Sequence, residues 1–192
     1  REHIGFDSEE GDVDYTYAPE SYYEFTTDYV ESHNQLYFDI LAADNSNVTA
    51  MVFFVDHMDS EITVPEGVYP INSSMALGTV YASPGVAVGG GPIQSYFCYT
   101  IEKEDGIYYD QEGLYCLVDG TVTVKKVDGK LSIDVDAYNS YDLSVKLHYN
   151  AAGTAVENVT TDEATVVKRL INGQLFIQRS GKTFNAQGAQ VN

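Results

Sequence analysis

Asp119-Gly-Thr-Val-Thr-Val-Lys-Lys-Val127 is followed at once by Asp128-Gly-Lys-Leu-Ser-Ile-Asp-Val135. Each half opens on an Asp-Gly pair, and a type I′ turn needs the positive φ angles that these two residue types accept. After the second pair, the apolar residues Leu131, Ile133 and Val135 alternate with polar ones. This alternation is the period-2 pattern of a half-buried strand. The stretch therefore predicts consecutive β-strands joined by tight turns at both Asp-Gly pairs.

A similar pattern lies about 95 residues earlier in the chain. There Leu36-Tyr-Phe-Asp-Ile40, a polar turn and an apolar run match Leu131-Ser-Ile-Asp-Val135, its polar turn and the apolar run after it. The match predicts two related β-meander units, at residues 21–56 and 115–150. A repeat of this length is typical of a duplicated barrel or sandwich half and not of a solenoid.

The end of the chain predicts a further meander. Three short apolar runs in residues 163–192 are separated by Asn172-Gly173 and Ser180-Gly181, both of which favour two-residue hairpin turns. Four of the ten basic residues are Lys168, Arg169, Arg179 and Lys182. This C-terminal three-strand meander could therefore dock on the acidic remainder of the chain.

Residues 1–20 are acidic and contain few core-forming side chains, which predicts a flexible or loosely packed entry segment. Its stretch Asp7-Ser-Glu-Glu-Gly-Asp-Val-Asp14 could offer oxygen ligands to calcium, but it lacks the Gly and Glu spacing of a calcium loop. We therefore predict an all-β fold, an antiparallel barrel or sandwich. It comprises this segment, a body at 21–162 that contains both units, and the meander at 163–192.

The charge and the cysteines restrict the class of partner. A net charge of −19 favours solubility and repels nucleic acid and anionic membranes. No apolar stretch approaches the roughly 18–20 residues that span a bilayer, so we predict a chain that does not span the membrane. The two cysteines, Cys98 and Cys116, could bridge neighbouring strands in an oxidising compartment or stay reduced in the core. Two cysteines are too few for a four-thiolate zinc site.

The C-terminal stretch Asn172-Gly-Gln-Leu-Phe-Ile-Gln-Arg-Ser-Gly-Lys-Thr-Phe-Asn-Ala-Gln-Gly188 resembles the segment that closes many secreted Bacteroidetes proteins. The body, with Val64-Pro-Glu-Gly-Val-Tyr69 and Asp119-Gly-Thr-Val-Thr-Val124, is similar to small calycin-like or β-sandwich domains of their secreted proteins and lipoproteins. The resemblance implies a secreted, periplasmic or outer-envelope location. Because the chain begins at Arg1, a leader or lipid anchor could precede it. The resemblance transfers no catalytic residue.

A search for catalytic chemistry nominates no residue. None of the four histidines lies in a metalloprotease or nucleophile-elbow motif. His57, flanked by carboxylates, is predicted to be a surface turn residue. Asp39 and Asp134 occupy matching points of the two units and could form a carboxylate pair, but alternation directs both away from the core. We predict no catalytic residue, no metal site and no cofactor.

Tyrosine gives the better motivated hypothesis. The chain has 16 Tyr and no Trp, and tyrosine combines an apolar ring with a polar tip that suits recognition surfaces. The leading hypothesis is a non-catalytic secreted or cell-envelope binding protein for a glycan or another surface component, although the lack of Trp weakens a carbohydrate platform. A calycin-like carrier of a small apolar ligand and a carboxylate-dependent hydrolase are the alternatives. The predicted binding residues are Tyr22, Tyr23, Tyr96, Tyr99, Tyr108 and Tyr109.

Overall fold

The structure, a computed structural model, has an all-β fold with no helix among the residues that it describes. These residues are 2–30, 33–83, 95–151, 167–171, 174–179, 182–185 and 190–191. The strands are β1 (Val13–Thr16), β2 (Tyr22–Val30), β3 (His33–Leu41), β4 (Asn47–Val55), β5 (Gly67–Asn72), β6 (Thr79–Tyr81), β7 (Tyr96–Lys103), β8 (Gly106–Cys116), β9 (Asp119–Val127), β10 (Lys130–Tyr138), β11 (Ser144–Asn150), β12 (Val167–Ile171), β13 (Gln174–Arg179), β14 (Lys182–Asn185) and β15 (Gln190–Val191).

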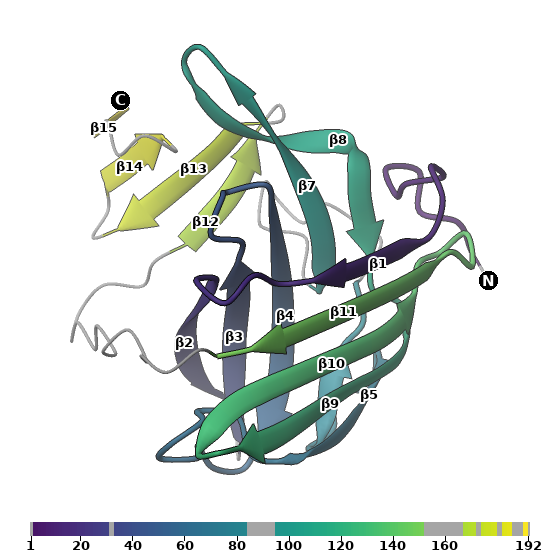
Figure 1. The fold of residues 1–192 in the computed structure, drawn as a ribbon, viewed down its shortest axis with the longest axis vertical. Helices are drawn as coiled ribbons and strands as arrows, with labels where there is room; N and C mark the ends of the chain where they lie inside the picture. The colour runs from purple at the N-terminus through teal and green to yellow at the C-terminus, as the bar shows by residue number, and fades with distance from the viewer. Residues whose placement is uncertain are drawn as a thin grey trace.

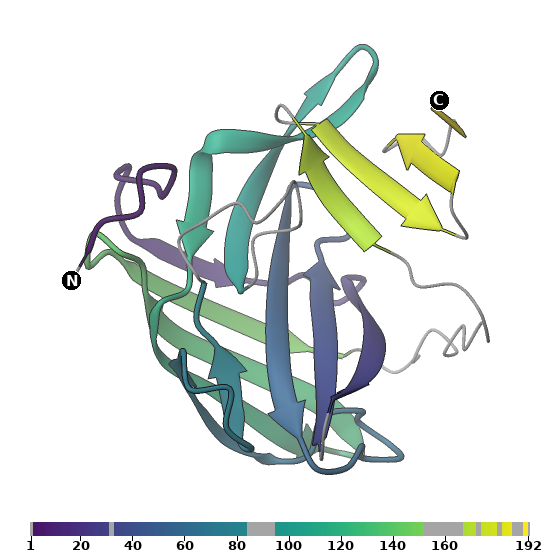
Figure 2. The same cartoon turned by 180° about the vertical axis from the view of Figure 1, so that it is seen from behind.

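The strands form one sheet that curls into a half-barrel, as Figures 1 and 2 show from opposite sides. The order is β1-β11-β10-β9-β5-β6-β4-β7-β8-β13-β14-β15, with β3 and β2 joined through β4, and β12 through β13. The β7–β8 hairpin and the C-terminal strands extend beyond one end of the half-barrel. The prediction of an all-β fold is therefore confirmed.

The sheet is mixed and not purely antiparallel. β1 runs parallel to β11, and β5 runs parallel to β6. Period-2 alternation identifies a strand and its buried face but carries no information on the direction of its neighbour. The antiparallel prediction is therefore wrong for these two pairs, and it holds for the other ladders among the described residues.

The two Asp-Gly pairs behave differently. Asp128 and Gly129 both have positive φ, 53° and 76°, and connect β9 to β10 as predicted. Asp119 and Gly120 instead lie at the start of β9, so the turn predicted there is wrong. A Cβ on Gly120 would lie 2.2 Å from the Asp136 backbone oxygen, so glycine is needed there for a close approach of β9 to β10.

Both predicted units contain three consecutive antiparallel strands, β2-β3-β4 and β9-β10-β11. Their second hairpins also close alike. The Asn45 amide donates to the Ala42 carbonyl, the Asp142 amide donates to the Asn139 carbonyl, and Asn45 and Asp142 both have positive φ. The similarity agrees with related units, and the duplication itself stays a prediction.

The N-terminal segment is firmly packed, so the expectation of a loose entry segment is wrong. The Asp7 carboxylate is buried and accepts hydrogen bonds from the backbone amides of Cys116 and Ser140, at 2.8 and 2.7 Å. The Asn139 side-chain amide also donates to Asp7, at 3.2 Å. These bonds attach the segment to β8 and to the β10–β11 loop, and β1 follows as an edge strand on β11.

At the C-terminus, β12, β13 and β14 form consecutive antiparallel pairs, which confirms the three-strand meander. The meander joins the main sheet where Gln174 of β13 pairs with Tyr108 of β8. The turns predicted at Asn172-Gly173 and Ser180-Gly181 lie outside the described residues.

Candidate functional site

The six predicted tyrosines do not form one surface. Tyr22 and Tyr23 lie on β2, and the other four lie on the β7–β8 hairpin. Neighbouring residues in a strand face opposite sides of the sheet. Accordingly, Tyr23 stacks on the core residue Phe38, with ring centroids 4.8 Å apart, and Tyr22 faces the other side.

Tyr96 and Tyr109 form a pair on the outer face of the hairpin. Their hydroxyl oxygens are 3.1 Å apart and their rings meet edge to face. Burial is the main reason why the pKa of Tyr96 lies well above its ordinary value. Both residues belong to or pack against a small second core formed by Val48, Tyr96, Cys98 and Leu114. This pair therefore has a packing role.

A different group lies at the inner face of the hairpin. It comprises Phe97 with Tyr15, Tyr99 and Tyr115 around it, together with Tyr17, which packs on Tyr15. We call Tyr15, Tyr17, Tyr99 and Tyr115 the tyrosine cluster. The Phe97 ring centroid lies 4.8 Å from that of Tyr99, 6.1 Å from that of Tyr15 and 6.2 Å from that of Tyr115. The rings of Tyr15 and Tyr17 are 5.0 Å apart and almost perpendicular. Residues from β1, β7 and β8 thus meet at one end of the half-barrel.

The phenol groups of this cluster lie close enough to influence one another. Burial raises the pKa of Tyr17, a hydrogen bond of 2.6 Å to Thr49 Oγ1 opposes the rise, and the nearby phenols of Tyr15 and Tyr99 add to it. Tyr17 and Tyr115 are buried, whereas Tyr15 is half-buried and the Tyr99 side chain is 36% exposed. Solvent therefore reaches the cluster at Tyr15 and Tyr99.

Gly113 of β8 leaves room for the Tyr99 side chain. A Cβ on Gly113 would lie 3.0 Å from Tyr99 Cβ and 3.2 Å from Asp110 Oδ2. The missing side chain therefore leaves space for Tyr99 to pack on β8, and the Asp110 carboxylate lies on the same face. Asp110 Oδ1 accepts a hydrogen bond from the Glu112 amide at 3.1 Å.

Asn47 lies directly beside Tyr99 on the other side, because β4 and β7 pair these two residues in register. Directly opposed residues share one face of a sheet, with Cβ atoms about 5 Å apart. Asn47 is only 2% exposed, and its Nδ2 donates to Ser46 Oγ at 3.1 Å. Its Oδ1 has no hydrogen-bond partner within the described part of the chain. A buried acceptor without a partner therefore adjoins the cluster.

Cys98 and Cys116 are both buried free thiols in the structure. They lie on neighbouring strands but not opposite each other, since Cys98 pairs with Leu114 and Cys116 with Tyr96. Burial raises the pKa of Cys98 and raises the pKa of Cys116 to about 12, so neither forms a thiolate at neutral pH. The structure describes both side chains as buried thiols, and the redox state of the pair stays a prediction.

The carboxylates and histidines that we weighed for catalysis are not brought together. Asp39 lies on β3 and Asp134 on β10, with four strands between them in the sheet order. Asp134 is instead hydrogen-bonded to His148 Nδ1 across β10 and β11. His57 is exposed and its Nδ1 lies 2.5 Å from Asp56 Oδ1, which is the surface turn position that we predicted.

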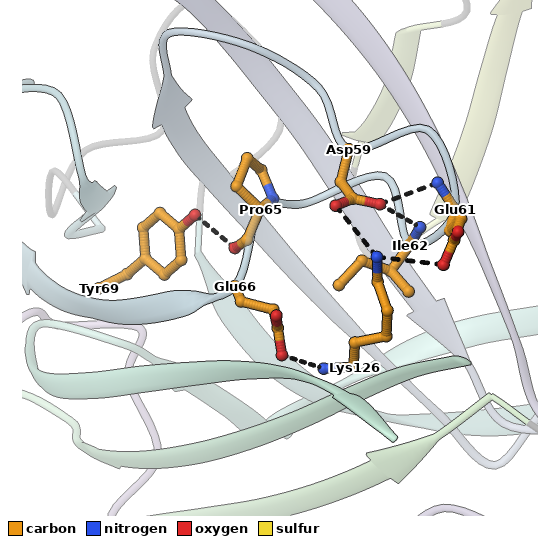
Figure 3. A network of polar contacts seen from close by, with 7 residues as sticks. All are labelled: Asp59, Glu61, Ile62, Pro65, Glu66, Tyr69 and Lys126. Carbon is orange, nitrogen blue, oxygen red and sulfur yellow. Dashed lines mark hydrogen bonds and ion pairs between the residues drawn. The ribbon is translucent and has the colours of Figure 1, made fainter. Parts of the chain in front are cut away.

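Figure 3 shows a network of polar contacts that involves the loop after the other end of β4. Lys126 Nζ lies 3.1 Å from Glu61 Oε2 and 3.5 Å from Asp59 Oδ2. Asp59 Oδ1 also accepts from the amides of Glu61 and Ile62, at 2.8 and 2.9 Å, and these backbone bonds are the main reason for its lowered pKa. We call these three charged residues the lysine network. It fastens the loop after β4 to β9.

Sequence reasoning selected Tyr99 but missed the other three tyrosines of the cluster, Tyr15, Tyr17 and Tyr115. Val13, Tyr15 and Tyr17 do alternate with polar residues, and that signal was available within the acidic segment.

The described residues contain no group of three or more His, Cys, Asp or Glu side chains that could hold a metal ion. Nor do they contain a helix long and apolar enough to cross a membrane. No protein-family model, curated protein or solved structure matches the chain.

Proposed function

We propose that the protein is a non-catalytic binding protein, secreted or held at the cell envelope, and that its ligand contacts the exposed side of the tyrosine cluster. The observation that carries the proposal is the convergence of three phenol rings on Phe97, with a fourth, that of Tyr17, packed on Tyr15, and with Tyr99 and Tyr15 partly exposed to solvent. Aromatic residues with a polar tip supply large, rigid contact area at low entropic cost.

Exposed side chains next to Tyr99 extend this surface along the hairpin. Ile101, two residues further along the same face of β7, is 41% exposed. Its register partner Tyr108 lies under Lys103 Nζ, 4.8 Å from the ring centroid. An apolar and aromatic strip bordered by charge is the kind of surface that binding proteins present to a ligand.

The packed interior gives no support to the carrier alternative. The Phe38 ring packs against the rings of Tyr23 and Phe53 inside the half-barrel, where an apolar ligand would have to lie. The hydrolase alternative has no support from Asp39 and Asp134, which lie on separate strands. The envelope location continues to rest on the resemblance of the C-terminal segment.

The test is a thermal-shift screen of glycans and small surface components against three versions of the chain: unmodified, Tyr99→Ala and Tyr138→Ala. Tyr138 at the end of β10 is a matched control because it is also an exposed tyrosine, at 41%. A ligand at 100 times its Kd stabilises the native state by about 2.7 kcal/mol. We expect the shift in the unmodified chain and Tyr138→Ala, and its loss in Tyr99→Ala. Equal shifts in all three would rule out the cluster as the site.

A further inference from the structure

The polar groups that we find beside Tyr99, in Asp110 and Asn47, both present hydrogen-bond acceptors. Asp110 contributes a carboxylate and Asn47 a carbonyl oxygen, and both groups accept hydrogen bonds without donating them from these atoms. The Tyr99 ring between them has a negative face. The site is therefore complementary to a ligand that donates hydrogen bonds and carries positive charge.

The charge of the hairpin points to the same ligand class. The sequence of β7 and β8, with the turn between them, contains Glu102, Glu104, Asp105, Asp110 and Glu112 but only one basic residue, Lys103. The whole chain has a net charge of −19. A surface of one sign concentrates ligands of the opposite sign near it. A cation on an aromatic ring is also already present on this face, in the contact between Lys103 and Tyr108.

The unpartnered Oδ1 of Asn47 is the independent observation that favours a ligand with N–H groups. A buried polar atom without a hydrogen bond is unfavourable, and such atoms are uncommon in native structures. A tetra-alkylammonium ion has no N–H to donate, whereas a primary or secondary ammonium has at least two. The acceptor therefore distinguishes between two kinds of organic cation.

We propose that the exposed side of the tyrosine cluster binds a primary or secondary alkylammonium group. The cation lies over the Tyr99 ring, Asp110 balances its charge, and one N–H is donated to Asn47 Oδ1. This inference rests on the proposed binding function and names the chemical class of the ligand. Because Asn47 Oδ1 is buried in the structure, the side chains around it, of which Tyr99 is the cross-strand neighbour, have to move for the bond to form. Binding is thus expected to change the environment of Tyr99.

The probes are butylammonium, tetramethylammonium and neutral butanol, each titrated into the chain while the tyrosine ring signals are followed by NMR. We expect butylammonium to bind at least about tenfold more tightly than butanol, which corresponds to the strength of a partly desolvated cation–π contact with its counter-ion. The affinity for tetramethylammonium should lie between those for butylammonium and butanol. Added salt should weaken both cations and leave butanol unchanged.

Four variants separate the contributions. Tyr99→Phe retains the ring and should bind normally, whereas Tyr99→Ala should abolish binding. Asp110→Asn should weaken both cations by about tenfold, while Asp136→Asn, an exposed carboxylate on β10, should not. Asn47→Leu should remove the preference for butylammonium over tetramethylammonium. A general loss of packing would instead weaken both cations alike and leave that preference unchanged.

Two outcomes would overturn the inference, and they are distinguishable from failure of the proposed function. Butanol binding as tightly as butylammonium, with loss of both in Tyr99→Ala, would leave the cluster as a binding site but not for cations. The same conclusion, a binding site that does not take cations, would follow if no amine bound while a ligand from the glycan screen depended on Tyr99. Loss of the proposed function itself requires that no ligand depends on Tyr99.

Discussion

The polar groups at the two ends of β4 differ in how well they are paired. Where the strand ends, the lysine network binds the following loop, and Lys126 and Asp59 each have at least two polar partners (Figure 3). Where the strand begins, roughly 25 Å away along its length, Asn47 Oδ1 is buried next to the tyrosine cluster and has no hydrogen-bond partner among the described residues. Ion pairs hold the first end, although His33 Nε2 beside it is also buried without a hydrogen-bond partner in the described part of the chain. The second end has its unpartnered atom next to a cluster of partly exposed aromatic rings. Such groups concentrate at functional sites because function, and not stability, keeps them there.

The largest expected effect is on the packing at the cluster. Phe97→Ala and Phe53→Ala each remove a fully buried ring and should each lower the free energy of unfolding by about 3–5 kcal/mol. The two positions differ in function, since Phe53 packs on Tyr69 near the loop end. Urea denaturation measures the first effect. Ligand binding under conditions where both variants are folded should be lost only in Phe97→Ala, and a loss in both would contradict the assignment of the site to one end.

Alkali should destabilise both ends. Burial raises the pKa of Tyr17 at the cluster, and burial followed by the charge of Asp56 raises the pKa of Tyr69 to about 12. Unfolded tyrosine titrates near about pH 10. The stabilisation is therefore complete below pH 10 and is lost as the pH rises from about 10 through the folded values.

Urea midpoints measured across this range should fall, and tyrosinate absorbance of these residues should appear together with unfolding. Tyr17→Phe should make the alkaline decline shallower. Full ionisation of every tyrosine while the chain is still folded would show that the phenols are not buried as described.

A smaller effect, of opposite sign, is expected at the unpartnered acceptor. Asn47→Leu replaces a buried amide by an apolar side chain of similar size and should raise the free energy of unfolding by about 1 kcal/mol. Thr49→Val is the matched control on the same face of β4, because Thr49 Oγ1 has a partner in the Tyr17 hydroxyl. That variant should lower stability. A decrease in both variants would mean that Asn47 Oδ1 is satisfied, and the contrast between the two ends would disappear.

The smallest effect is expected in the lysine network. Lys126→Met should lower Tm slightly at low ionic strength, and the difference from the unmodified chain should vanish near about 1 M salt, because ion pairs that solvent can reach are screened. Lys130→Met, on the other side of the same turn, serves as the control for removing one positive charge. A salt-independent loss in Lys126→Met alone would show that the alkyl chain, and not the charge, fastens the loop.

Sequence alone predicted most strands because their side chains alternate. Leu131, Ile133 and Val135 are buried as the period-2 pattern requires, and the turn at Asp128-Gly129 has the expected backbone angles. The direction of β1 against β11 could not be predicted in the same way. It depends on pairing between residues more than 130 positions apart, which local alternation does not encode.

The candidate site was predicted only in part, for a similar reason. Tyr99 was selected, but its neighbours Tyr15 and Asn47 come from strands distant in the sequence, and only the sheet register brings them together. The adjacent residues Tyr22 and Tyr23 illustrate the opposite error. They are close in the sequence, yet the pleat directs them to opposite faces, so proximity along the chain misled the prediction.

The hydrogen bonds of Asp7 also determine when this chain can finish folding. Its carboxylate is bonded to an amide 109 residues later and to another 133 residues later. During synthesis the N-terminal segment is made first, but its partners exist only after the β10–β11 loop has emerged. Contacts of such long sequence separation close slowly, and an edge strand that waits for them is exposed to the wrong neighbours. The edge of β11 is thus a point at which newly made chains are vulnerable to exchange of β1 between copies.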